Sequence, residues 1–278
     1  MLWMVAGNRY VRFAGLDGKP QRAAVEELPV EPLDGESLEL PPPYRLLAPV
    51  EPPEVWGAGV TYLRSRDARI EESEAKDLYT LVYDADRPEL FLKDAACRRT
   101  VGPGDAIAVR SDSAWSVPEP EIGLVLADAG AITGVTIGND VSSSSIEGTN
   151  PLYLPQAKIY AGACALGPAV LEPDDWSQPF AIEMRILSSD GREAYAGETS
   201  TDQMRRSFDE LAAWLVRENP VPPGSVLLTG TGLVPPADFT LEPGHVVEIR
   251  VPGIGLLKNP VVSAASLVSE PTRSEAHV

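Results

Sequence analysis

The chain has 278 residues, 44% of them hydrophobic, and its formal net charge at pH 7 is −18. This length allows a sizeable buried core, whereas the acidic balance argues against nucleic acid or an anionic membrane surface as a partner. There is no run of apolar residues long enough for a membrane span and no leader pattern at the start of the chain. Cys97 and Cys164 lie far apart, which predicts buried thiols in a reducing cytoplasm.

Residues 1 to about 48 are predicted to form a small N-terminal domain. Short strands are expected at residues 2–5 and 10–13, with a hairpin turn at Asp17-Gly18. Clusters of prolines at 41–43 and 49–53 mark the boundary. We expect a main domain over residues 49–268 and a frayed tail over 269–278.

Short apolar runs between turn residues predict most of the remaining structure as strands, at residues 55–60, 89–93, 106–109, 122–126, 131–137, 181–187, 193–198, 226–229 and 246–251. The charged segment 64–81 predicts a helix followed by a mobile stretch to Asp86. Charge alone leaves open whether this segment is a lid or a solvated surface helix. A second, amphipathic helix is expected over residues 203–219, with Met204, Phe208, Leu211 and Leu215 on one face. The fold class is therefore mixed β (α+β) with few helices.

Two glycine-rich stretches do not meet the requirements of nucleotide-binding loops. Residues 57–59 (GAG) are followed by Tyr62 where a dinucleotide loop has its third glycine, and residues 229–232 (TGTG) lack the lysine of a phosphate loop. We reject both nucleotide interpretations.

Three carboxylates indicate a metal site. Glu119 and Glu121 are two residues apart at the start of a predicted strand, so their side chains point to the same face. Asp140 ends the next predicted strand, and pairing of the two strands as a hairpin places it beside the glutamates. Carboxylates that converge without a counter-ion become protonated, and all-oxygen ligands favour Mg²⁺, Mn²⁺ or Ca²⁺. The alternative is that the three acids are solvated strand ends.

Several motifs together resemble the fumarylacetoacetate hydrolase superfamily. They are PEPE at 118–121, GNDVS at 138–142, a following lysine, LLTGTG at 227–232 and the closing strands at 243–249 and 253–260. Residues 61–69 (TYLRSRDAR) and 150–158 (NPLYLPQAK) are similar to the 2-keto-3-deoxy-arabinonate and -xylonate dehydratases. The resemblance implies a β-roll or sandwich core, Mg²⁺ held by Glu119, Glu121 and Asp140, Lys158 beside the metal, and a homodimer or larger assembly.

One departure from the superfamily is informative. Its hydrolases carry a histidine that activates water, and Ser65 occupies the corresponding position here. Without a base of that kind, hydrolysis is disfavoured. The sequence therefore favours a Mg²⁺-dependent dehydratase of a 2-keto-3-deoxy sugar acid that forms 2-oxoglutarate semialdehyde through a metal-stabilised enolate.

The resemblance also suggests roles for individual residues. Lys158 is either the base that removes a C3 proton or an anchor for the substrate carboxylate, and Glu89 is either the acid that assists the leaving hydroxyl or a surface strand end. Candidate substrate contacts are Thr231, Gln156, Tyr153, Lys93 and Arg64. Two other functions remain open: a Mg²⁺-dependent hydrolase or decarboxylase of acylpyruvate-like β-diketo acids, and a non-catalytic module that binds a metal or sugar acid. The chain length and stereochemistry of the substrate also stay open.

Overall fold

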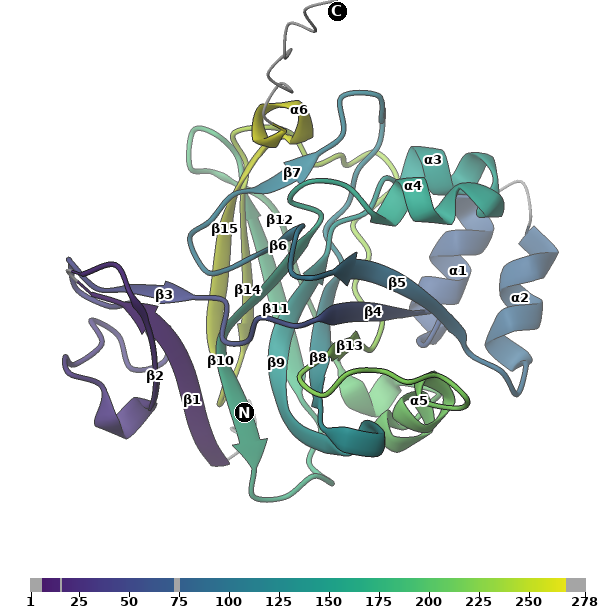
Figure 1. Cartoon of the computed structure of the whole chain (residues 1–278). Coiled ribbons are helices and arrows are strands. Elements are labelled where there is room, and N and C mark those ends of the chain that lie inside the picture. The colour runs from purple at the N-terminus through teal and green to yellow at the C-terminus, as the bar shows by residue number, and fades with distance from the viewer. Residues whose placement is uncertain (1–6, 16, 73–75, 269–278) are drawn as a thin grey trace, which may run out of the picture.

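Two β-sheets packed face to face form the body of the protein, and most of the helices lie at one end of it (Figure 1). The computed structural model describes residues 7–15, 17–72 and 76–268. The mixed architecture with few helices confirms the predicted fold class. No helix in these described ranges is long and apolar enough to cross a membrane.

The larger sheet has ten strands in the order β2-β1-β10-β9-β8-β13-β4-β5, with β3 paired to β1 and β6 to β10. At its centre, β8 and β9 are buried along almost their whole length, which explains why they are continuous apolar runs instead of alternating patterns. The strands are β1 (Gly7–Ala14), β2 (Pro20–Ala24), β3 (Arg45–Leu47), β4 (Glu54–Gly59), β5 (Glu89–Ala95), β6 (Thr100–Val101), β8 (Pro120–Leu126), β9 (Ile132–Asp140), β10 (Cys164–Pro173) and β13 (Val226–Leu228).

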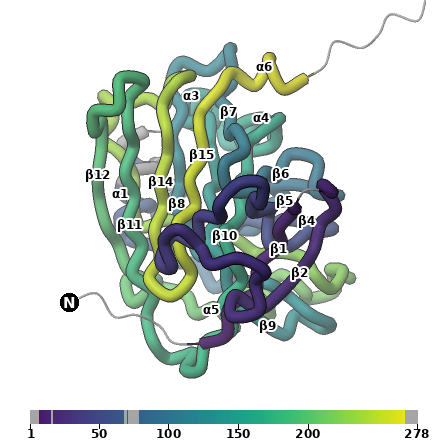
Figure 2. The backbone as a smooth tube through the Cα atoms, turned by 90° about the vertical axis from the view of Figure 1, so that its left-hand side faces the viewer, coloured from purple at the N-terminus to yellow at the C-terminus, as the bar shows by residue number. Residues whose placement is uncertain are grey.

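The smaller sheet has five strands in the order β12-β11-β14-β15-β7, which Figure 2 shows from one edge to the other. Its central strands alternate between buried and more exposed residues, because only one face packs on the core. The strands are β7 (Ile107–Val109), β11 (Ala181–Leu187), β12 (Glu193–Ser200), β14 (Val246–Val251) and β15 (Gly255–Ser263).

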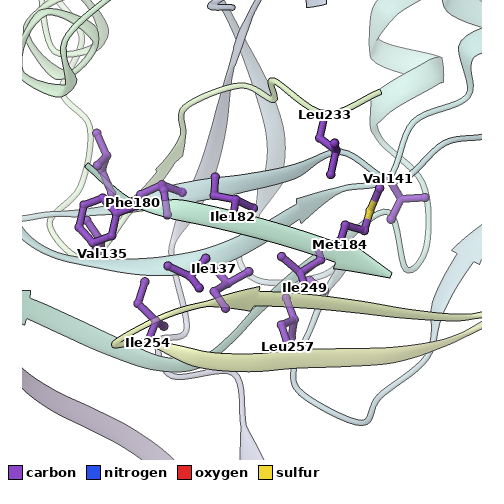
Figure 3. Close-up of a cluster of buried hydrophobic side chains, with 14 of the residues drawn as sticks. Val135, Ile137, Val141, Phe180, Ile182, Met184, Leu233, Ile249, Ile254 and Leu257 are labelled. Atoms are coloured by element: carbon purple, nitrogen blue, oxygen red, sulfur yellow. The ribbon is translucent and has the colours of Figure 1, made fainter. Parts of the chain in front are cut away.

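The main hydrophobic core lies between the two sheets (Figure 3). Val135 and Ile137 of β9 enter it from the larger sheet, and Ile182 of β11, Ile249 of β14 and Leu257 of β15 enter it from the smaller one. Burial of this apolar surface stabilises the packing of the two sheets. The core therefore supports the β8–β9 hairpin on the face that packs against the smaller sheet.

The helices are short. The pair α1 (Leu63–Glu72) and α2 (Lys76–Asp84) lies beside α3 (Ser144–Thr149) and α4 (Leu154–Lys158), near the β4–β5 edge of the larger sheet (Figure 1). The predicted helix over 64–81 is therefore two helices, and residues 73–75 lie outside the described ranges. The others are α5 (Phe208–Leu215), α6 (Ala264–Leu267) and the 3-10 turns Val25–Glu27, Asp128–Gly130, Pro151–Tyr153 and Thr201–Gln203.

The predicted helix over residues 203–219 was wrong in extent, because α5 has only eight residues. Ser207 is its N-cap, and the Ser207 hydroxyl accepts a hydrogen bond from the backbone N–H of Glu210 at 3.1 Å. Met204, which matched the helical spacing, forms instead an isolated β-bridge with Tyr62. At the other end, the Asn219 side chain donates to the Leu215 carbonyl at 3.1 Å and so caps the last turn.

The N-terminal region is joined to the larger sheet. Strand β1, which contains the predicted strand 10–13, pairs antiparallel with β10, β2 and β3 (Figure 1). The β1–β2 pairing confirms the hairpin predicted at Asp17-Gly18. A small core of its own, including Val11, Phe13 and Leu38, fills the region. The domain boundary near residue 48 stays a prediction, and the predicted strand 2–5 and tail 269–278 lie outside the described residues.

The two cysteines are both free thiols, but only one is buried. Burial raises the pKa of Cys164 to about 12, and partial burial raises the pKa of Cys97 to about 11. The expectation of two buried thiols was therefore wrong for Cys97, which is partly exposed. Both thiols remain protonated, and so unreactive, at neutral pH.

Candidate metal centre and active-site cavity

The β8–β9 hairpin brings the three predicted carboxylates together. Glu121 pairs with Gly138 across the two strands, and the backbone N–H of Asp140 donates to the Glu119 carbonyl at 2.9 Å. One carboxylate oxygen from each of Glu119, Glu121 and Asp140 lies within 4.8 Å of the others. Their exposures are only 6%, 2% and 1%, so solvated strand ends are excluded as an interpretation of these residues.

Two lysines partly balance this buried charge. Lys158, at the end of α4, donates to Glu119 Oε2 at 2.5 Å, to Asp140 Oδ2 at 3.0 Å and to Ser142 Oγ at 2.6 Å. Lys93 of β5, fully buried, forms an ion pair with the other oxygen of Asp140. Asp140 is therefore held between two ammonium groups.

The electrostatics of the cluster are uneven. Burial raises the pKa of Glu121 well above its usual value, and the charges of Asp140 and Glu119 add to this effect. Burial also opposes ionisation of Asp140, but the charges of Lys158 and Lys93 outweigh it, so the pKa of Asp140 is lowered. Glu121 has weaker compensation, which includes the backbone N–H of Gly230 at 2.6 Å from its Oε2.

These residues fit a divalent cation. The ligand set consists of carboxylate oxygens, which suit hard ions such as Mg²⁺, and the three groups already converge within ligand distance of one site. Burial is the main cause of the raised pKa of Glu121, and the charges of Asp140 and Glu119 add to it. Three carboxylates face only two ammonium groups, which leaves a deficit of positive charge. A bound cation would remove it.

The cluster forms one wall of a cavity. The other lining residues come from β4, α1, β5, α3, α4 and the segments after β4, before β8 and after β13: Ala58, Gly59, Val60, Ser65, Glu89, Phe91, Val117, Glu147, Lys158, Gly230, Thr231 and Val234. Gly230 has a φ of +87°, and a Cβ there would collide with the Thr61 hydroxyl. This glycine therefore allows the loop to present its N–H to Glu121.

The structure places only some of the predicted catalytic and substrate-binding residues at the cavity. Glu89 and Thr231 line it. Lys93 is buried behind Asp140 and is not among the lining residues. The side chains of Tyr153, Gln156 and Arg64 are exposed and do not line the cavity either. Local spacing did not reveal which way these side chains point.

Ser65 lies at the cavity wall, where the superfamily's hydrolases were expected to have a histidine. It is 7% exposed, its hydroxyl donates to the Tyr62 carbonyl at 2.8 Å, and it accepts from the Tyr62 N–H at 3.2 Å. Ser65 therefore caps the first turn of α1. Among the described residues that line the cavity there is no histidine.

Sequence reasoning missed two residues of the site. The sequence alone indicated no individual role for Glu147 or Ser142, and Glu147 lies on the short helix α3 (Ser144–Thr149). This helix directs the Glu147 side chain, 5% exposed, to the cavity wall. Ser142 accepts a hydrogen bond from Lys158. An acidic residue within a small polar segment after a metal ligand was the available signal for Glu147.

The end of α2 is tied to the main body. Arg206, 6% exposed, donates to the carbonyls of Ala85 at 2.5 Å and Asp86 at 3.0 Å. The Arg205 guanidinium lies 5.2 Å from the ring centroid of Tyr83. The stretch before Asp86 is thus anchored at its C-terminal end, and a lid role for α1 and α2 stays a prediction.

The FAA hydrolase C-terminal family, named for fumarylacetoacetate, matches residues 55–262. The chain belongs to the fumarylacetoacetate hydrolase family. A Haloferax volcanii protein named a probable 2-keto-3-deoxyxylonate dehydratase is 54% identical to this chain over 216 residues. The match covers 77% of this chain and 74% of the relative. A Saccharolobus solfataricus 2-dehydro-3-deoxy-D-arabinonate dehydratase is 46% identical over 222 residues, 78% of this chain and 74% of that protein.

A solved structure of the same family extends the likeness to three dimensions. It is a 2-keto-3-deoxy-D-arabinonate dehydratase complexed with magnesium and 2,5-dioxopentanoate, 37% identical, with a TM-score of 0.79. The match covers 92% of this chain and 99% of that one. The predicted family resemblance and its dehydratase branch are confirmed.

Proposed function

We propose that this protein is a Mg²⁺-dependent dehydratase of a 2-keto-3-deoxy-pentonate that releases 2,5-dioxopentanoate, which is 2-oxoglutarate semialdehyde. The observation that carries the proposal is the cavity itself. It combines three buried carboxylates with a lysine in contact with two of them, and it has Ser65, not a histidine, at its wall. The two dehydratase relatives and the solved dehydratase support the same activity.

Glu119, Glu121 and Asp140 would hold the cation, with Mn²⁺ or Ca²⁺ as possible substitutes. A cation bound there supplies Lewis-acid chemistry: it draws electron density from the keto oxygen of a 2-keto acid, which makes the C3 protons more acidic.

Lys158 is the candidate base for one of those protons. It touches Glu119 and Asp140, so a substrate bound at the cluster lies beside it. Lys158 Nζ, in its neutral form, would accept the C3 proton, while the C4–O bond breaks and the hydroxyl leaves as water with a proton from Glu89. A proton shift from C5 to C3 then gives an enol, and transfer of the enol hydroxyl proton to C4 yields the aldehyde. The alternative role of Lys158, binding the substrate carboxylate, uses the same contact.

Two further residues have proposed binding roles. Thr231 lines the cavity, and its hydroxyl both donates to and accepts from the backbone of Leu233 at 3.1 Å. That geometry fixes the loop that also carries Gly230. Arg64 lies on α1, Tyr153 on the 3-10 turn Pro151–Tyr153 and Gln156 on α4, and their exposed side chains would contact the substrate only after these segments move.

The test is a comparison of substrates with the purified protein and Mg²⁺. We expect aldehyde formation from 2-keto-3-deoxy-pentonates of either C4 configuration to exceed the consumption of acetylpyruvate. Both C4 epimers and the six-carbon homologues belong in the assay, because the cavity residues do not by themselves fix length or stereochemistry. Faster consumption of acetylpyruvate than of every 2-keto-3-deoxy acid would overturn the proposal in favour of the hydrolase alternative.

We further propose a homodimer or larger assembly in the cytoplasm. The family resemblance supports this proposal, and Leu152, 84% exposed, and Leu81, 67% exposed, are candidate contact residues. The free thiols suit a reducing compartment. Light scattering of the purified protein measures its mass, and a monomer at micromolar concentration would contradict the assembly.

A further inference from the structure

Two carboxylates line the cavity without belonging to the metal cluster. They are Glu147 of α3, 5% exposed, and Glu89 at the start of β5, which is partly buried. Neither is among the three acids whose oxygens converge within 4.8 Å. Metal binding by the cluster therefore does not explain why two more acidic side chains line this cavity.

Their position identifies the end of the cavity that they occupy. Glu89 and Glu147 also line a neighbouring hollow beneath α2, together with Tyr79, Val82, Pro88, Leu90, Pro151 and Leu154. None of the metal-cluster residues lines that hollow. The two glutamates therefore lie on the α2 side of the cavity, where it borders a hollow that the metal-cluster residues do not line. A substrate whose keto-acid end binds at the cluster extends its other end toward them.

The chemistry of this distal wall is that of hydrogen-bond acceptors. Among the described residues that line the cavity, Lys158 is the one cation, and it contacts the cluster. The Glu89 carboxylate packs directly against the backbone of β4 at Gly59. A Cβ at position 59 would collide with it, so the residue there must be glycine. A carboxylate has about four lone-pair directions, so it can accept from a substrate hydroxyl even while it bonds to another protein group.

We propose that Glu147, together with Glu89, makes the cavity selective for 2-keto acids with neutral hydroxyl groups at the distal end and against 2-keto diacids. A substrate hydroxyl can donate to either carboxyl group, whereas a second substrate carboxylate is repelled by the negative charge of Glu147 in a partly desolvated site. The inference rests on the proposed function, because it assumes that the keto-acid end lies at the metal cluster.

Binding measurements test this selectivity without turnover. Calorimetry with Mg²⁺ present compares 2-oxopentanoate with 2-oxoglutarate, which have the same chain length and differ in the distal carboxylate. Pyruvate, which has no distal group, serves as the reference ligand. We expect the wild-type protein to bind 2-oxoglutarate more weakly than 2-oxopentanoate. Equal or tighter binding of 2-oxoglutarate would overturn the proposal, whatever the outcome of the dehydration assay.

Substitutions then assign the effect to Glu147. Glu147→Gln should strengthen binding of 2-oxoglutarate by about tenfold, the scale of removing one nearby like charge, and leave pyruvate binding unchanged. Glu147→Asp keeps the charge and should keep the discrimination. Glu172→Gln removes an exposed acid outside the cavity and controls for net charge. An unchanged ratio in Glu147→Gln, or the same gain in Glu172→Gln, would refute the assignment.

Discussion

Lys93 offers a sharp test of how the metal cluster is built. It was predicted to contact the substrate, yet the structure buries it completely against Asp140. Lys93→Met removes the ammonium group and keeps most of the side-chain volume. Removing one partner of a buried ion pair typically costs 3 to 5 kcal/mol, and we expect about 3 kcal/mol here. The lower end applies because Asp140 keeps Lys158, and because the Val141 carbonyl, which accepts from Lys93 at 2.9 Å, also accepts from Tyr160 at 3.1 Å.

The assay is urea unfolding of the metal-free protein, followed by tryptophan fluorescence. Lys258→Met is the matched control, since Lys258 lies 2.9 Å from Glu248 but its side chain is 56% exposed. An exposed pair of this kind contributes less than about 1 kcal/mol. If Lys93→Met unfolds like Lys258→Met and mainly raises the Michaelis constant, Lys93 is a substrate contact and the structural role is wrong.

Two other predictions concern the same cluster. Lys158→Met should lower the turnover rate by roughly two to four orders of magnitude if Lys158 is the base; a near-normal rate for Lys158→Arg, with the loss confined to apparent affinity, would instead identify it as the carboxylate anchor. Because the pKa of Glu121 is raised by burial, this group must release a proton when the cation binds, so Mg²⁺ affinity should increase with pH, by up to about tenfold per unit while Glu121 is protonated. Asp140, whose pKa is lowered, is already ionised and adds nothing to this slope. Calorimetry in two buffers of different ionisation enthalpy counts the proton, and an affinity independent of pH would contradict the assignment.

The metal cluster was predictable because its geometry is local. Two apolar runs separated by a short turn predict a hairpin, and the two-residue period of a strand puts Glu119 and Glu121 on one face. The register of β8 and β9 then brings in Asp140. The contact of Lys158 came from the family resemblance, since a residue on a separate helix cannot be placed by strand periodicity.

The remaining features depend on long-range packing. Strand β10 was missed because Gly167 and Pro168 within it are typical of a turn. In the structure the strand continues through both residues, and its pairing with β9 shifts register at this point. The direction of Lys93 into the core and of Glu147 into the cavity follows from how β5 and α3 dock on the sheet. Neither direction is encoded in the neighbouring residues alone.

The most direct test of the central claim is the metal dependence of dehydration. The rate of 2,5-dioxopentanoate formation from a 2-keto-3-deoxy-pentonate is measured with chelator, and then with increasing Mg²⁺, for the wild-type protein and Glu121→Gln. We predict no formation with chelator, full recovery in the wild type, and recovery in Glu121→Gln only at much higher Mg²⁺, if at all. Full activity of the wild-type protein in chelator, or the same Mg²⁺ requirement in both proteins, would contradict a metal site built on these three carboxylates.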